Sequence, residues 1–201
     1  MRAAHKTLIA AACLASGWAQ AAVVKVASVK AVGSYTNAPA LVTDGVFPTP
    51  ASSVNSGTNV YWTGQEGSSG VVITMKFDQA YLLTGASYSL DNNDAYRIQV
   101  SKNGTIWYNL IRVESYDGEV SGGMDTFSTL PSSPYYVEDH SFAPLVASYA
   151  RVFARGGDGT YAVGELQFYG TATVPEPEAL ALLLAGVGVA GTVARRRAAK
   201  A

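Results

Sequence analysis

A period-two alternation of apolar and polar residues constrains this chain more than any other feature. Residues 71–77 read Val-Val-Ile-Thr-Met-Lys-Phe, so every second side chain is apolar. Tyr96, Ile98 and Val100 repeat the pattern around polar neighbours. A β-strand sends successive side chains to opposite faces, so this spacing predicts strands with one buried face.

The segments between these runs carry turn residues. Asn103-Gly104 predicts a two-residue hairpin turn, because both residues tolerate a positive φ. Further strands are expected over 107–113, 148–154 and 163–169, with the turn Gly156-Gly-Asp-Gly159 before the last of them. No stretch has helical periodicity of useful length. Short strands separated by such turns favour an all-β, antiparallel sandwich over a parallel α/β sheet.

Charge and cysteine content exclude several classes of function. Residues 23–170 contain thirteen acidic and eight basic residues, and a negative body repels phosphate backbones. We therefore expect no nucleic-acid binding. The single cysteine, Cys13, lies close to the N-terminus in a segment that we expect to be removed. The mature chain then has no disulfide, thiolate metal site or cysteine nucleophile.

The N-terminus has the three parts of a secretory signal peptide. Arg2 and Lys6 precede a short apolar run over residues 7–15, and Ala19-Gln-Ala21 has the small-x-small pattern of a cleavage site. The apolar run is too short to remain as a membrane-spanning helix. Residues 1–21 are therefore interpreted as a removable signal peptide, and the protein is expected to be exported.

The C-terminus has a second ordered set of features. A Pro-Glu-Pro motif is followed by an apolar run over residues 179–194 and then by a basic cluster. The motif residues are Val174, Pro175, Glu176, Pro177, Arg195, Arg196 and Arg197. An ordinary tail anchor is one interpretation, because a basic cluster after an apolar run favours a cytoplasmic end. In its order and spacing, however, the segment closely resembles the PEP-CTERM sorting signal of Gram-negative bacteria.

This resemblance implies how the protein is sorted after export. In that family the segment is recognised and cut by an exosortase, an integral-membrane, transpeptidase-like enzyme. Residues 172–201 would then hold the chain in the inner membrane as a transient transmembrane helix. The mature protein would afterwards lie at the cell surface or in the extracellular matrix. Bacteria with this system usually also make exopolysaccharide, which becomes a candidate partner.

The segment between the two ends resembles a second family. Leu-Val-Thr-Asp-Gly at 41–45 is followed by a Tyr-x-Ile-x-Val-Ser-x-x-Gly-x-x-Trp hairpin at 96–107. Ala-Arg-Val at 150–152 and Glu-Leu-x-x-Tyr-Gly at 165–170 complete the order. It resembles the discoidin or coagulation-factor C group of the galactose-binding-like fold.

The second resemblance implies a jelly-roll β-sandwich over residues 22–171 that binds a carbohydrate or glycan. Trp62 and Trp107 match family positions that are expected in the core. The chain lacks the cysteine pair of the animal members and diverges over 47–59 and 114–138. Loops that contact a ligand are expected in these two stretches.

The same resemblance implies a structural calcium ion. Family members hold it near the Asp-Gly loop and on the acid of the last strand, positions that match Asp44 and Glu165. An alternative remains open, in which Asp44 makes an Asx turn before Gly45 and Glu165 is a solvated strand residue. No other cofactor is expected.

Sugar binding requires aromatic faces for the ring and planar polar groups for its hydroxyls. Tyrosines and asparagines in or beside the expected loops meet this requirement. The candidates are Tyr35, Asn37, Asn59, Tyr61, Asn92, Asn93, Tyr116, Tyr135 and Tyr136. The alternative is that this Tyr- and Asn-rich surface is merely solvated.

Catalytic groups are sparse after removal of the signal peptide. The remaining histidine, His140, precedes a predicted strand and is expected to be structural. The carboxylate pairs Asp91/Asp94 and Glu114/Asp117 could serve acid–base hydrolysis, but they lie in turn-like segments where solvation is expected. We therefore predict a non-catalytic, exported carbohydrate-binding protein. A matrix protein without a sugar site and a secreted glycan-active enzyme are the alternatives.

Overall fold

The structure, a computed structural model, describes residues 21–64, 70–173 and 186. Its described strands are β1 (Ala22–Val23), β2 (Val26–Val32), β3 (Val60–Thr63), β4 (Val72–Asp91), β5 (Ala95–Ser101), β6 (Tyr108–Val113), β7 (Met124–Ser128), β8 (Leu145–Gly156) and β9 (Thr160–Ala172). Two short 3-10 turns, η1 (Pro39–Thr43) and η2 (Glu138–His140), are the helical segments within 21–64 and 70–173. The predicted all-β class is confirmed.

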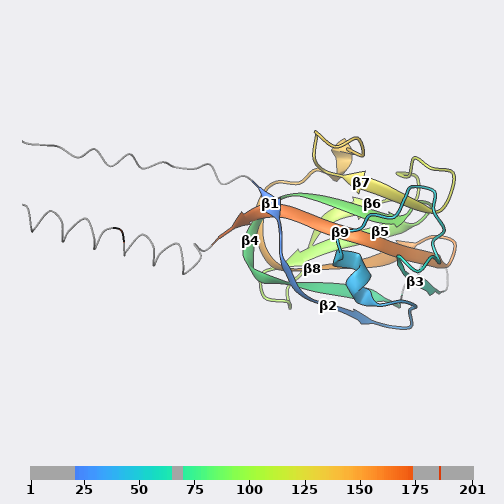
Figure 1. Cartoon of the computed structure of the whole chain (residues 1–201), viewed down its shortest axis with the longest axis horizontal. Helices are drawn as coiled ribbons and strands as arrows, with labels where there is room; N and C mark the ends of the chain where they lie inside the picture. Colours follow the sequence, from blue (N-terminus) through green and yellow to red (C-terminus); the bar gives the residue numbers. More distant parts are fainter. Residues whose placement is uncertain (1–20, 65–69, 174–185, 187–201) are drawn as a thin grey trace, which may run out of the picture.

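Strand β4 connects the two layers of the sandwich (Figure 1). Its first part, residues 72–76, pairs with β2 and β8, and β8 continues through β5 to β6. The register shifts between Lys76 and Tyr81. Residues 81–83 of β4 still pair with β8, and they also begin the pairing with β9, which β7 joins from residue 87. Strand β9 also pairs with β1 and β3. Every one of these pairings is antiparallel, as the turn-rich sequence predicted.

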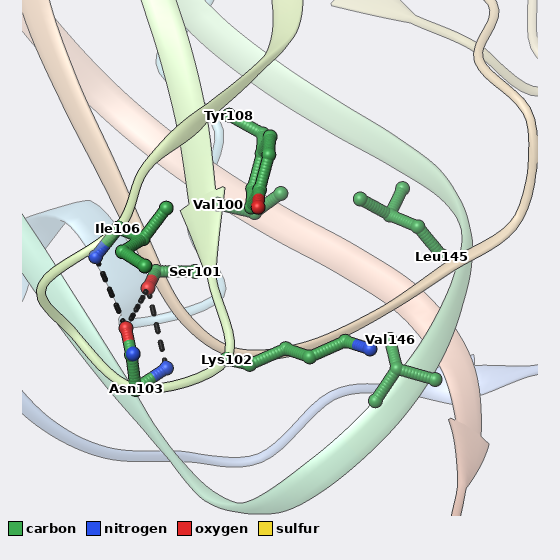
Figure 2. A pocket seen from close by; sticks show the side chains of 8 residues that line it. All are labelled: Val100, Ser101, Lys102, Asn103, Ile106, Tyr108, Leu145 and Val146. Atoms are coloured by element: carbon green, nitrogen blue, oxygen red, sulfur yellow. Dashed lines mark hydrogen bonds between the residues drawn. The ribbon is translucent and has the colours of Figure 1, made fainter.

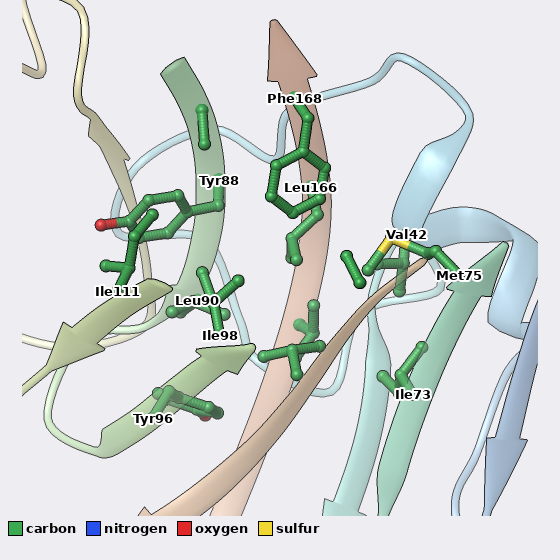
Figure 3. Packing of buried hydrophobic residues seen from close by; sticks show 14 of the residues in the cluster. Val42, Ile73, Met75, Tyr88, Leu90, Tyr96, Ile98, Ile111, Leu166 and Phe168 are labelled. Carbon is green, nitrogen blue, oxygen red and sulfur yellow. The ribbon is translucent and has the colours of Figure 1, made fainter. Parts of the chain in front are cut away.

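The core lies between these layers, and both halves of β4 contribute to it (Figure 3). Ile73 and Met75 come from its first half, whereas Tyr88 and Leu90 come from its second half; all four side chains are fully buried. Phe168 of β9 joins them. The period-two pattern of the sequence therefore marks the face of each strand that packs into the core.

The two ends of the described domain lie side by side at one end of the sandwich (Figure 1). Ala22 pairs with Gly170, and the Thr173 amide donates to the Ala80 carbonyl at 3.0 Å. We call this the proximal end. The opposite, distal end is built from the loops 51–59, 92–94, 114–123 and 157–159. Of the expected signal peptide (1–21) and sorting segment (172–201), all residues except 21, 172, 173 and 186 lie outside the described ranges.

Three local predictions need correction. The connection between β5 and β6 spans residues 102–107 and is not a two-residue turn, because Asn103 Oδ1 accepts the amides of Thr105 and Ile106, each at 3.0 Å. The strand expected directly after His140 is absent: His140 ends η2, and the next strand, β8, begins only at Leu145. Trp107 is half-buried, and the Arg151 guanidinium lies over its ring at 4.3 Å. Trp62 is in the core, as expected.

None of the helices described in this chain is long and apolar enough to span a membrane.

Candidate functional site

A polar depression of about 500 Å³ opens at the distal end. We call it the distal depression. It is lined by Ala51, Ser52, Ser53, Val54, Asp91, Asn93, Ser121, Gly122, Gly123, Asp158 and Thr160. Four separate chain segments supply these residues, and both divergent stretches of the sequence are among them. The segments converge because β4, β5, β8 and β9 all begin or end at this end of the sandwich.

Backbone hydrogen bonds join the loops that wall the distal depression. The Ala51 amide donates to the Met124 carbonyl at 2.7 Å, and the Met124 amide donates to the Ser52 carbonyl at 2.9 Å. The Asn92 amide donates to the Gly123 carbonyl at 3.1 Å. Gly123 is required here, because a Cβ atom would lie 2.3 Å from the Ser52 carbonyl oxygen. The walls are therefore fixed by the fold before any ligand binds.

Asn37 and Asn59, two of the predicted ligand residues, shape one of these loops from behind. The Asn37 side-chain amide donates to the carbonyls of Ser56 and Asn59 at 3.1 and 2.8 Å. The Asn59 amide donates to the carbonyls of Ser53 and Val54 at 3.1 and 3.2 Å, and its side chain is fully buried. A buried side chain has no surface for a ligand. Asn59 therefore does not contact a ligand but holds the loop that forms one wall of the depression.

Two other predicted asparagines lie at the depression itself. Asn93 is exposed in its lining and donates to Asp158 Oδ2 at 3.1 Å. Asn92 is 7% exposed, and its side-chain amide donates to the Val120 carbonyl. The structure therefore places one accessible carboxamide, that of Asn93, where a hydroxyl group could reach it.

The predicted tyrosines separate into three places. Tyr116 is 82% exposed on the 114–123 loop, which also supplies Ser121 to Gly123. Tyr35 packs partly against the core beside β3, which contains Tyr61. Tyr135 and Tyr136 lie beyond β7, where Tyr136 pairs with Ser128. Of these five rings, Tyr116 is the exposed one that shares a loop with the distal depression.

Asp91 and Asp94 are buried, which corrects the expectation that they are solvated. Loss of water, followed by the negative charge of Asp158, raises the pKa of Asp91 to about 7. Loss of water, followed by the charge of Asp91, raises the pKa of Asp94 to about 8. The 157–159 turn covers the pair, because the Asp158 amide donates to Asp94 Oδ1 at 3.1 Å.

The second carboxylate pair, Glu114 and Asp117, is committed to structural partners. Glu114 Oε1 lies 3.2 Å from Arg97 and 2.6 Å from Arg112. Asp117 Oδ2 lies 3.0 Å from His140 Nε2, and the other ring nitrogen lies 2.6 Å from the Tyr88 hydroxyl. This Asp–His–Tyr chain ends at a fully buried tyrosine, which leaves a substrate no approach to the hydroxyl.

Asp44 and Glu165, the predicted calcium ligands, lie in one depression of about 380 Å³. Both Glu165 oxygens accept from the Gly45 amide at 3.3 Å, and Asp44 Oδ1 accepts from the Val46 amide at 2.9 Å. Burial, with a contribution from Asp44, raises the pKa of Glu165 to about 7. The described residues contain no group of three or more His, Cys, Asp or Glu side chains that could hold a metal ion. Two carboxylates with carbonyl and water oxygens remain a chemically suitable donor set for Ca²⁺.

A second pocket, of about 570 Å³, lies beside the β5–β6 connection (Figure 2). We call it the proximal pocket. Val100, Ile106, Leu145 and Val146 make much of its lining apolar. Figure 2 shows that the polar atoms of Ser101 and Asn103 are hydrogen-bonded within the connection. Tyr108 is 60% exposed at its edge. The pocket therefore offers an aromatic ring and the exposed Lys102 side chain, but few other free polar groups.

Asp158, Ser52 and Ser53 line the distal depression, although sequence reasoning did not single them out. For Asp158 a signal was present, because it sits in the predicted turn before the last strand. Antiparallel pairing places that turn at the same end as residues 91–94. For the two serines, the sequence contains no comparable signal, since their position depends on the path of the irregular 47–59 loop.

Comparison with known proteins identifies the C-terminal segment. Residues 173–198 match the model of the PEP-CTERM protein-sorting motif, which confirms the resemblance seen at Val174 to Pro177 and Arg195 to Arg197. No curated protein matches this chain.

Carbohydrate-binding modules are among the solved structures that match this chain. A truncated AlyQ with CBM32 and alginate lyase domains is 12% identical with a TM-score of 0.50, over 77% of this chain and 34% of that chain. The CBM32 of AlyQ in complex with 4,5-unsaturated mannuronic acid is 13% identical with a TM-score of 0.49, over 73% and 97%. A pectin-binding carbohydrate-binding module is 18% identical with a TM-score of 0.46, over 76% and 96%. The chain therefore combines a β-sandwich similar to that of CBM32 modules with a C-terminal PEP-CTERM sorting motif.

Proposed function

We propose that this protein is exported, processed by an exosortase, and binds carbohydrate without catalysis at the cell surface or in the extracellular matrix. Residues 1–21 would be removed as a signal peptide, residues 22–171 would form the binding domain, and residues 172–201 would serve sorting. The observation that carries the binding function is the distal depression, a preformed polar site on a carbohydrate-binding-module fold.

The chemistry of the distal depression supports a sugar ligand. Asn93, Ser53 and Thr160 offer a carboxamide and hydroxyl groups that can exchange hydrogen bonds with sugar hydroxyls. Ala51, in the wall, has a φ of +63°, a strained backbone that the cross-bonded loops hold in place. Tyr116, on the 114–123 loop that also supplies part of the wall, presents an exposed ring against which a sugar face can stack.

The proximal pocket is the second candidate for this function, because the exposed Tyr108 ring could also stack on a sugar. It has fewer free polar groups, however, and sugar orientation depends on such groups. We therefore assign the sugar to the distal depression. An unspecific matrix protein and a glycan-active enzyme remain as alternatives, and both differ from this proposal in the measurements below.

A calcium ion bound by Asp44 and Glu165 is a further part of the proposal. The desolvated Glu165 carboxylate and the neighbouring Asp44 supply negative charge that a hard cation would neutralise. The ion would fix the Asp-Gly loop after η1 against β9. Glu165→Gln is expected to lower Ca²⁺ affinity at this position, as measured by titration calorimetry.

Retention of the purified chain by polysaccharides tests the proposed function. Affinity electrophoresis through gels that contain neutral, amino or uronic-acid polysaccharides should show retention on at least one of them. Tyr116→Ala should weaken that retention about tenfold, the effect of losing one stacking contact.

Tyr135→Ala is the matched control, because Tyr135 is also an exposed tyrosine but lies beyond β7, away from the distal depression. It should leave retention unchanged. Absence of retention on every polysaccharide would favour the unspecific matrix protein, and release of reducing ends from any glycan would favour the enzyme.

A further inference from the structure

The loop between β4 and β5 buries two acidic groups together without a basic partner. Asp91 and Asp94 are 3% and 0% exposed, and they lie close enough for the charge of Asp91 to raise the pKa of Asp94. The ion pairs found among the described residues involve Glu114 and Asp117 instead. Two buried carboxyl groups that repel each other cannot both be ionised unless a positive charge lies close to them.

Two buried side-chain oxygens in this loop have no hydrogen-bond donor among the described residues. Asp94 Oδ1 accepts the Asp158 amide, but Oδ2 is buried and receives no hydrogen bond from any described residue. In the same loop, Asn92 is also more than nine-tenths buried, and its Oδ1 has no donor among the described residues. Buried acceptors without protein donors are rare in folded proteins, and an ordered water or a bound ion usually satisfies them.

We propose that Asp91 and Asp94 bind a hard divalent cation beneath the distal depression. Carboxylate and amide oxygens are the ligands that Ca²⁺ and Mg²⁺ prefer. Because no three acidic, His or Cys side chains of the described chain converge on a metal position, the two carboxylates are completed by neutral oxygens. Backbone carbonyls and water are usual members of such shells.

The surrounding fold holds this position firmly. The 157–159 turn closes against Asp94 so tightly that a Cβ atom on Gly157 would lie 1.5 Å from Oδ1. Asp158 adds a third negative charge, which raises the pKa of both carboxyl groups further. A bound cation therefore ties the end of β4 to the turn before β9. Since Asp91 and Asp158 line the distal depression, the ion also stiffens its floor.

This cation position differs from the one proposed at Asp44 and Glu165, and it does not depend on sugar binding. The test therefore uses the Glu165→Gln variant of the full chain as its background, purified in mild detergent and stripped with EDTA. Titration calorimetry at pH 8 with CaCl₂, and separately with MgCl₂, measures binding before and after Asp94→Asn is added.

We expect the background variant to bind Ca²⁺ or Mg²⁺, and Asp94→Asn to lower that affinity at least tenfold. The carboxamide that this substitution introduces can donate to Asp91, so the metal-free double variant should melt no earlier than its background. Asp91→Asn serves as a second variant if the first does not fold. The proposal is wrong if the background binds neither cation, or if both aspartate variants bind it as the background does.

Discussion

At the distal end, a few single residues determine how the 157–159 turn packs against the loop between β4 and β5. The buried Asp91–Asp94 pair, the unpaired Asp94 Oδ2 and the adjacent 157–159 turn form one small assembly. It exists because Gly157 has φ +147° and no side chain.

Gly157→Ala should destabilise the protein by at least about 2 kcal/mol, because the new Cβ meets the buried carboxyl group and the backbone is strained. Gly156→Ala is the matched control, since nothing lies within 4 Å of a Cβ there and its φ is not positive. Urea unfolding of the two variants measures the difference. Equal midpoints would show that the turn does not close on Asp94.

In EDTA the protein should lose stability as the pH rises from about 5 to 8. The unfolded chain releases the protons of Asp91 and Asp94 near pH 4, whereas the folded state holds them up to about 7 and about 8. The folded state therefore binds more protons in this range, so its free energy of unfolding falls with rising pH.

Thermal unfolding across this pH range measures the loss. Glu165, whose pKa is also raised to about 7, contributes to it, and Asp94→Asn should reduce the slope because one of the three carboxyl groups is gone. A parent protein whose melting temperature stays constant or rises between pH 5 and 8 would contradict the desolvation of these carboxyl groups.

At the scale of elements, one side chain joins the two layers. The hydroxyl of Tyr96, on β5, donates to the Ala162 carbonyl at 3.2 Å and accepts the Ala162 amide at 3.1 Å, on β9. Burial, followed by the charges of Asp94 and Asp91, raises the pKa of this phenol well above its usual value. The hydroxyl therefore stays protonated and keeps its role as a donor.

Tyr96→Phe should lower the free energy of unfolding by about 2 kcal/mol, because it leaves a buried amide and carbonyl of β9 without this partner. Chemical denaturation measures the change. Tyr108→Phe, on β6, removes a hydroxyl from an exposed ring and should change the stability by less than about 0.5 kcal/mol. Similar effects of the two substitutions would mean that the Tyr96 hydroxyl does not join the layers.

The sequence predicted the β-strands better than it predicted the candidate site. Alternation over 71–77 and 96–100 identified strands because each has one face in the core. It could not show that β4 crosses between layers near Tyr81, since alternation does not report which sheet a strand joins. The site was less predictable. Asn93 lines the distal depression, and Tyr116 lies on a loop that supplies part of its wall. Asp91 and Asp94, in contrast, looked solvated because their burial depends on a turn about sixty residues away.

At the scale of the whole molecule, the two ends of the sandwich have different surroundings. Ala22 and Thr173 leave the proximal end together, so a chain held at its C-terminus would present the distal end outward (Figure 1). The distal depression is then the part of the molecule most accessible to a large polysaccharide. The proximal pocket lies on the side from which the sorting segment continues.

Blocking the distal depression or the proximal pocket with a bulky label tests most directly whether carbohydrate binds at the distal depression. In a Cys13→Ser background the chain has no other cysteine, so Asn93→Cys and Ile106→Cys each accept one bulky polyethylene glycol maleimide, at the distal depression and the proximal pocket respectively. Polysaccharide retention is then compared with and without the label. We predict that the label at residue 93 abolishes retention and the label at residue 106 leaves it intact. Retention that survives the first label, or that is lost only with the second, would contradict binding at the distal depression.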